Sequence, residues 1–123
     1  MKFKVKKPIP GFENIDEVRL RKVDDDFALL EDKNGNILFI LINPFYLKQD
    51  YDFEVPADVR VLLDLKEGSN TYIFTNVVKR NPTKESLINF KAPFIFNLDN
   101  NTCAQVILED EGIYPLKEFT KAS

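Results

Sequence analysis

The sequence predicts a single all-β domain over residues 1–123, folded as a compact, antiparallel, barrel-like sheet with one short helix. Seven or eight short apolar runs are separated by turn residues at close intervals, a pattern typical of a sandwich or a closed sheet. The length suits one domain. With 44% hydrophobic and 30% charged residues, the composition is that of an ordinary globular protein, and eleven Phe against no Trp predict a core filled by phenylalanine.

The strongest local signal is the stretch 27–45, FALLEDKNGNILFILINPF. Two apolar runs flank Asn34 and Gly35, a dipeptide that suits a tight hairpin turn because both residues adopt positive φ readily. The second run, 37–42, has six apolar residues without a break and predicts a strand covered on both faces. Pro44 ends this strand because proline has no backbone N–H to donate. We therefore expect this hairpin at the centre of the sheet.

Alternation and composition predict the other strands in turn. Residues 2–6 alternate lysine with apolar side chains, which indicates a half-buried strand whose lysines would protect a sheet edge. Residues 18–23 alternate similarly, and the three aspartates that follow form a solvated turn. Further strands are expected at 71–78, 86–90, 94–98 and 103–108, with a last strand or tail at 113–119.

Residues 56–66 fit two structures. In a helix, Pro56 lies in the first turn, Gly68 follows as a stop, and one face carries Val59, Leu62 and Leu63. In a strand, the period of two gives one face that carries Val59, Val61, Leu63 and Leu65. We favour the short helix, and the strand remains open.

The formal net charge is −3 and is unevenly distributed. Residues 1–10 carry four lysines and no acid, whereas residues 11–32 carry eight acids against three bases. An acidic chain repels phosphate backbones and suits a basic partner protein. No apolar segment follows the basic start, as a signal peptide requires, and no run approaches the roughly 20 apolar residues that span a bilayer. We expect a cytoplasmic monomer with no membrane contact.

The chemistry of common enzymes is absent from the sequence. There is no histidine, no glycine-rich phosphate-binding motif and one cysteine, Cys103. We therefore predict no catalytic residue, no cofactor and no metal site. Cys103 alternates with Gln105 and Ile107, and we expect it to be a small buried side chain.

The loop after Pro44 is the candidate for a partner surface, because aromatic side chains lie beside acids there. Tyr46 and Tyr51 would be interface anchors and Asp50 would steer a basic partner. In the competing interpretation, Phe45 and Phe53 fold back to cover the end of the sheet. The predicted partner-binding residues are Asn43, Phe45, Tyr46, Asp50, Tyr51 and Glu54.

Several segments, taken in order, resemble the bacterial flagellar assembly factor family FliW. The resemblance extends from about residue 9 to residue 114, and the family usually has Asp where this chain has Asn43. The matching segments are IPGFE at 9–13, FALL at 27–30, LFILINPF at 38–45, DY at 50–51, NFKAPFIFNL at 89–98 and QVIL at 105–108.

The resemblance implies a barrel-like all-β protein without enzymatic activity that binds two proteins. Members of the family bind flagellin before its export. They also bind CsrA, a small dimeric regulator that covers the ribosome-binding region of flagellin mRNA. By analogy, binding to CsrA would be allosteric and would favour a CsrA state with poor RNA affinity. Flagellin would compete for this chain, which makes the system a partner switch.

Two other functions are weighed against this one. The first is a small nucleic-acid-binding β-barrel that uses Lys2, Lys4, Lys6 and Lys7, with Phe3 as a stacking platform. The acidic balance of the chain argues against it. The second is a carboxylate hydrolase, which rests only on the abundance of Asp and Glu.

Overall fold

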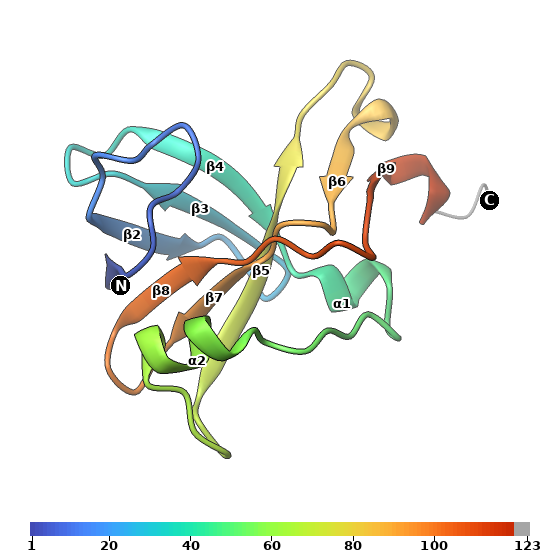
Figure 1. Ribbon diagram of the computed structural model, residues 1–123. Coiled ribbons are helices and arrows are strands. Elements are labelled where there is room, and N and C mark those ends of the chain that lie inside the picture. The colour runs from blue at the N-terminus through green and yellow to red at the C-terminus, as the bar shows by residue number, and fades with distance from the viewer. Residues whose placement is uncertain (120–123) are drawn as a thin grey trace.

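The computed structural model describes residues 1–119, in which nine strands form one continuous sheet (Figure 1). The strands are β1 (Lys2–Val5), β2 (Glu17–Lys22), β3 (Phe27–Glu31), β4 (Ile37–Ile42), β5 (Thr71–Val78), β6 (Leu87–Asn89), β7 (Phe94–Asn97), β8 (Thr102–Gln105) and β9 (Ile113–Pro115). The helices are α1 (Pro44–Leu47) and α2 (Ala57–Leu63), with 3₁₀ turns at Thr83–Glu85 and Leu116–Glu118.

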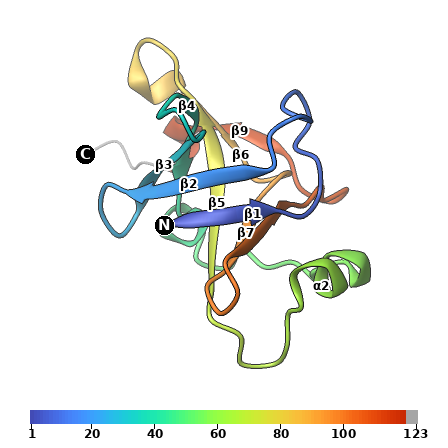
Figure 2. The same cartoon turned by 90° about the vertical axis from the view of Figure 1, so that its left-hand side faces the viewer.

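Seven strands close into a barrel in the order β4-β3-β2-β1-β8-β7-β5, and β5 completes the ring by pairing with β4. The long strand β5 is shared between the barrel and a small extension. Its residues 71–74 pair with β7, whereas residues 77–78 pair with β6, which in turn pairs with β9. Figure 2 shows β1 and β2 crossing in front of β5 on the barrel wall. The predicted all-β, barrel-like fold is confirmed.

One strand pair of the barrel is parallel, which corrects the expectation of a fully antiparallel sheet. β1 pairs with β8 in parallel, with Lys4 opposite Thr102 and Val5 opposite Cys103. The reason is geometric, because strict alternation of direction cannot close around an odd number of strands. The same pairing places β1 between β2 and β8. Its lysines therefore protect no edge, and that prediction was wrong.

The sheet has a core on each side. The cluster inside the barrel includes Phe3, Leu20, Leu30, Phe94 and Phe96. The second cluster lies outside the barrel wall, under α1, α2 and the loop between them. It contains Ile42, Tyr51, Val59, Leu63, Ile88, Phe90, Ile95, Ala104, Val106 and Leu108.

The strand covered on both faces is β7, not β4. Phe94 and Phe96 point into the barrel and Ile95 into the outer core, because successive side chains of a strand alternate between faces. All four residues of β7 are buried. In β4 only Leu41 and Ile42 are buried, and coverage falls off towards the start of the strand. The prediction that residues 37–42 are covered throughout was therefore wrong for the first half.

The turn between β3 and β4 is wider than the predicted two-residue hairpin. It spans residues 32–36, and Gly35 has positive φ (+84°) whereas Asn34 does not. The Asp32 carboxylate accepts hydrogen bonds from the backbone N–H of Asn34 and Asn36, each at 2.9 Å, and from Asn36 Nδ2 at 3.0 Å. These bonds, those from Asn36 foremost, lower the pKa of Asp32. An aspartate side chain thus organises the turn in place of a second residue with positive φ.

The helix favoured for residues 56–66 is present as α2, which corresponds to the single short helix expected. Val59 and Leu63 are fully buried against the barrel, whereas Leu62, expected on the same face, is 38% exposed. The helix ends at Asp64, which adopts a left-handed conformation with φ of 52°.

The segment expected as a loop after Asn43 begins with the additional helical turn α1. No helix within residues 1–119 is long and apolar enough to cross a membrane.

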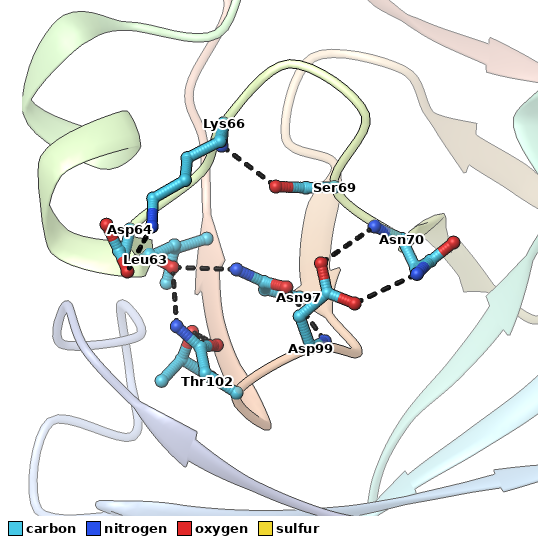
Figure 3. Close-up of polar contacts among 9 residues, drawn as sticks. Leu63, Asp64, Lys66, Ser69, Asn70, Asn97, Asp99 and Thr102 are labelled. Atoms are coloured by element: carbon cyan, nitrogen blue, oxygen red, sulfur yellow. Dashed lines mark hydrogen bonds and ion pairs between the residues drawn. The ribbon is translucent and has the colours of Figure 1, made fainter.

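A polar network fixes the end of α2 to the turn between β7 and β8 (Figure 3). The carbonyl oxygen of Leu63 accepts hydrogen bonds from Asn97 Nδ2 at 2.8 Å and from Asn100 Nδ2 at 2.9 Å. Beside it, the Asp99 carboxylate accepts bonds from the side chain (2.9 Å) and backbone N–H (3.1 Å) of Asn70, which lower its pKa. The network satisfies a carbonyl at the helix end that would otherwise lack a partner.

We expect the substitution Asn97→Ala to lower the free energy of unfolding by about 1–3 kcal/mol, because a buried donor is lost. Asn100→Ala removes the other bond to the same carbonyl from a more exposed side chain and should change stability by only about 0.5 kcal/mol. Urea denaturation of both variants measures the difference. Equal effects would contradict the assignment of Asn97 as the principal anchor of α2.

Candidate interaction surface

The six predicted partner-binding residues lie on α1, at its N-cap and in the loop that follows it. Some of them support this region from within, and the others are exposed. Asn43 caps α1, because its Oδ1 accepts a hydrogen bond from the Phe45 backbone N–H at 3.0 Å. Pro44 occupies the first helical position, where a missing N–H is tolerated. Phe45 is part-buried and packs against the outer core. Asn43 and Phe45 therefore shape this region from within.

Tyr51 is a core residue, so its assignment as an exposed anchor was wrong. Its side chain is 2% exposed. Its ring centroid lies 5.6 Å from those of Phe45 and Phe53 and 5.4 Å from that of Phe90. The Tyr51 hydroxyl donates a 2.7 Å hydrogen bond to the carbonyl oxygen of Phe90. The competing interpretation, in which Phe45 and Phe53 fold back, is confirmed by this cluster.

The surroundings of Tyr51 raise its pKa. Burial is the main cause, because it disfavours the charged phenolate, and the nearby carboxylates of Glu111 and Asp110 act in the same direction. Lys48 bridges the two segments, with its Nζ 3.6 Å from Glu111 Oε2 and 5.9 Å from the ring centroid of Phe90. The turn at 109–111 is thus held beside the loop that follows α1.

The exposed remainder forms what we call the acidic surface. Tyr46 has 59% of its surface exposed, and Asp50 and Glu54 are also exposed. Glu54 Oε1 lies 3.9 Å from Arg60 Nη2, a weak contact between exposed groups. The acidic surface consists of Tyr46, Asp50, Asp52, Glu54, Glu109 and Asp110. An exposed aromatic among carboxylates is the arrangement that suits a basic protein partner.

The N-terminal lysines do not form a nucleic-acid platform. Phe3 is 1% exposed and lies in the barrel core, where no base can stack on it. Lys4 is opposite Glu17 on β2, and Lys7 Nζ lies 3.5 Å from Asp58 Oδ2. The alternative function loses its stacking residue.

Sequence reasoning missed an apolar groove on the outer face of β4, β5 and β6. Its volume is about 240 Å³. It was missed because β4 was expected to be covered on both faces. The lining residues are Phe27, Ile40, Ile42, Val77, Lys79, Thr83, Ser86, Ile88 and Leu116.

Cys103 is 1% exposed, as expected for a small buried side chain, and burial raises the pKa of its thiol to about 12. Such a thiol is almost entirely protonated at neutral pH and is a poor nucleophile. Among residues 1–119, no group of three or more Cys, Asp or Glu side chains is arranged to hold a metal ion.

Comparison with known proteins gives one consistent result. A family model described as "FliW protein" matches residues 1–119. The chain is 46% identical over 116 residues to "Flagellar assembly factor FliW 2" of Wolinella succinogenes, covering 94% of this chain and 84% of that protein. It is 44% identical over 119 residues to "Flagellar assembly factor FliW" of Sulfurimonas denitrificans, covering 96% and 94%.

A solved structure, "Crystal structure of the flagellar assembly factor FliW", superimposes with a TM-score of 0.87. The alignment covers 99% of this chain and 88% of that one, at 21% sequence identity. At this identity the likeness shows the fold alone. It extends over the barrel and its β6–β9 extension together.

We expect Tyr51→Phe to lower the free energy of unfolding by about 1–2 kcal/mol, because the buried carbonyl of Phe90 loses its donor. The melting temperature should fall by roughly 3–6 °C for each kcal/mol. Tyr46→Phe, at the exposed tyrosine, should leave the melting temperature unchanged.

The same pair of variants tests the raised pKa. A group whose pKa is higher in the folded than in the unfolded state stabilises the fold below the unfolded pKa, about 10 for tyrosine, and ceases to do so as the pH rises. The stability difference between wild type and Tyr51→Phe should therefore shrink above pH ~10. A difference that stays constant up to strongly alkaline pH would contradict the raised pKa.

Proposed function

The chain belongs to the FliW family of flagellar assembly factors, and on this premise we propose that it acts by binding flagellin and, alternately, CsrA. The observation that carries the proposal is the family match over residues 1–119, which includes both cores and both helices. Assembly factors act by binding, so the proposed role requires no catalytic residue or cofactor. Both partners would be met in the cytoplasm, before flagellin is exported.

In this proposal the chain is an allosteric antagonist of CsrA. It binds a CsrA conformation with poor RNA affinity and so shifts the CsrA population away from flagellin mRNA. Translation of flagellin is then relieved. The shift is limited by the difference in affinity for the two CsrA states, because a ligand that binds both states equally changes nothing.

In this proposal flagellin competes with CsrA for binding to the chain. When flagellin accumulates, it occupies the chain, CsrA is released and translation falls. When flagellin is exported, the chain returns to CsrA. The direction depends on the concentrations and the two affinities, and linkage requires that each partner weaken binding of the other by the same factor.

The acidic surface supports contact with CsrA. An RNA-binding protein must present basic side chains to phosphate, and a net-negative partner attracts such a surface. Tyr46 supplies an exposed aromatic on α1, whose backbone is held by the Asn43 cap and the Tyr51 cluster. Tyr46 would anchor the contact and Asp50 and Glu54 would steer it.

The proposal is tested by titrating the purified protein with CsrA and, separately, with monomeric flagellin from the same organism, followed by competition. We expect binding to both, with each displacing the other. Binding to flagellin alone would exclude the proposed control of flagellin translation through CsrA. Binding to neither protein would mean that the chain shares the fold of the family but not the proposed function. Fluorescence anisotropy with flagellin leader RNA is the control, since direct, salt-dependent RNA binding would favour the nucleic-acid-binding alternative.

We expect Tyr46→Ala to weaken CsrA binding by at least about fivefold, because the loss of roughly 1 kcal/mol that this represents is exceeded by only a minority of interface residues, its anchors among them. The melting temperature should be unchanged, since Tyr46 is exposed. Asp50→Lys should lower the association rate at low salt by roughly fivefold, from about 1 kcal/mol of Coulomb energy near the surface. Glu17→Lys makes the same charge change on the barrel wall at β2 and serves as the matched control. Equal rates for the two charge variants would exclude Asp50 from steering.

A further inference from the structure

Strand β4 is paired on both edges over only half of its length. Its register with β5 runs from Ile40, opposite Val77, to Ile42, opposite Thr75. Residues 37–39 have β3 as their only neighbouring strand among the described residues. Beyond Val77, β5 turns away to pair with β6. The first half of β4 and the β5–β6 hairpin therefore diverge, as Figure 1 shows. We call the edge of β4 at residues 37–39, together with the facing end of β5 at Val78, the notch.

The notch is apolar and is not protected as sheet edges usually are. Ile37 and Val78, on its two sides, are 56% and 42% exposed. Leu38 and Phe39 complete the open edge of β4 without a lysine or proline, the residues that normally prevent a strand edge from pairing. The apolar groove described above adjoins it through Ile40. A continuous apolar region at a free strand edge is typical of an interaction site.

A second observation concerns β5 just before the point where it leaves β4. Asn76, opposite Leu41 in the last paired part of β5, has a buried Oδ1 atom with no hydrogen-bond partner in the structure. Buried acceptors without a donor are uncommon in folded proteins.

The rim of the notch is basic, although the chain as a whole is acidic. Lys79, Arg80 and Lys84 are exposed on the hairpin between β5 and β6, and within residues 1–119 none of them forms an ion pair. The nearby Glu85 is neutralised by Lys117, whose Nζ lies 3.1 Å from Glu85 Oε1. Charge complementarity therefore favours a segment that carries acidic side chains beside its apolar ones.

We propose that the notch binds an extended apolar segment of a partner protein, which adds as a strand to β4 at residues 37–39 and directs acidic side chains towards Lys79, Arg80 and Lys84. The inference rests on the proposed function, in which the chain has two partners. The acidic surface suits the RNA-binding partner, whereas this basic-rimmed notch suits the other one. Flagellin is therefore the partner whose segment occupies the notch.

Hydrogen exchange tests the added strand directly. With saturating monomeric flagellin, the backbone amides within residues 37–39 should exchange at least about tenfold more slowly, because pairing with a new strand protects them. The amides of α2, which lies on another side of the barrel, should be unaffected. Saturating CsrA should not produce the protection at 37–39.

A charged residue at the edge provides the matched mutational test. Ile37→Lys should weaken flagellin binding by about tenfold or more, because lysine opposes strand pairing, and should leave CsrA binding unchanged. Ile107→Lys places the same charge at an isoleucine of nearly equal exposure, 55%, outside the groove, and should bind flagellin like the wild type. Lys79→Glu should weaken flagellin binding at low salt and lose this effect at high salt.

The outcomes separate this inference from the function on which it rests. The inference is overturned if Ile37→Lys binds flagellin with wild-type affinity and the wild-type complex shows no protection of the amides at residues 37–39. The proposed function would remain intact in that case, because the complex still forms. Failure of the wild-type chain to bind flagellin overturns both. Protection that appears without flagellin as the protein concentration rises assigns the notch to a second copy of the chain and also overturns the inference. If Ile37→Lys fails to fold, exchange on the wild-type complex decides alone.

Discussion

The two-sided burial of β7 is the constraint on which the rest of the molecule depends. Phe94 and Phe96 fill the barrel, while Ile95 and the Asn97 amide contact the layer of helices outside it. One short strand therefore joins two hydrophobic cores, and α2 is fixed because its last carbonyl is bonded from that strand. The Tyr51 cluster extends the outer core as far as α1. The backbone beneath the acidic surface is consequently held by packed and capped residues, while the side chains of that surface are exposed.

Local patterns in the sequence predicted the elements better than the way those elements meet. Alternation located β1 and β2, and composition gave β5 with its observed bounds. The closing β4–β5 pair and the parallel β1–β8 pair were not predictable, because non-local pairs such as Ile40 with Val77 and Lys4 with Thr102 leave no local periodicity. An unbroken apolar run shows that a strand can be covered but not what covers it. For that reason the expected burial of β4 was too high, and that of β7, which ends in a buried asparagine, was too low.

The sequence indicated the correct segment for the candidate surface, but not which of its residues are exposed. Aromatic residues beside acids identified the segment after Pro44, yet side-chain type does not distinguish Tyr46 from Tyr51, which have 59% and 2% exposure. Burial of Tyr51 follows from its hydrogen bond to Phe90, a contact across 39 positions of sequence. Strand β4 connects this surface to the notch, and its six residues span about 20 Å. Two folded partners at its two ends would overlap in space, so competition between them needs no shared residue.

The parallel pairing of the first strand with a strand near the end of the chain also sets the order of events during synthesis. β1 is synthesised before β8, its parallel partner, which is the last strand of the ring in sequence order. Until then the barrel is an open, curved sheet with its phenylalanines unshielded, because non-local pairs cannot form before both strands exist. Both partner surfaces depend on the closed ring. In the proposed function, a chain whose ring is still open would therefore not yet bind its partners, and only chains that include β8 would act.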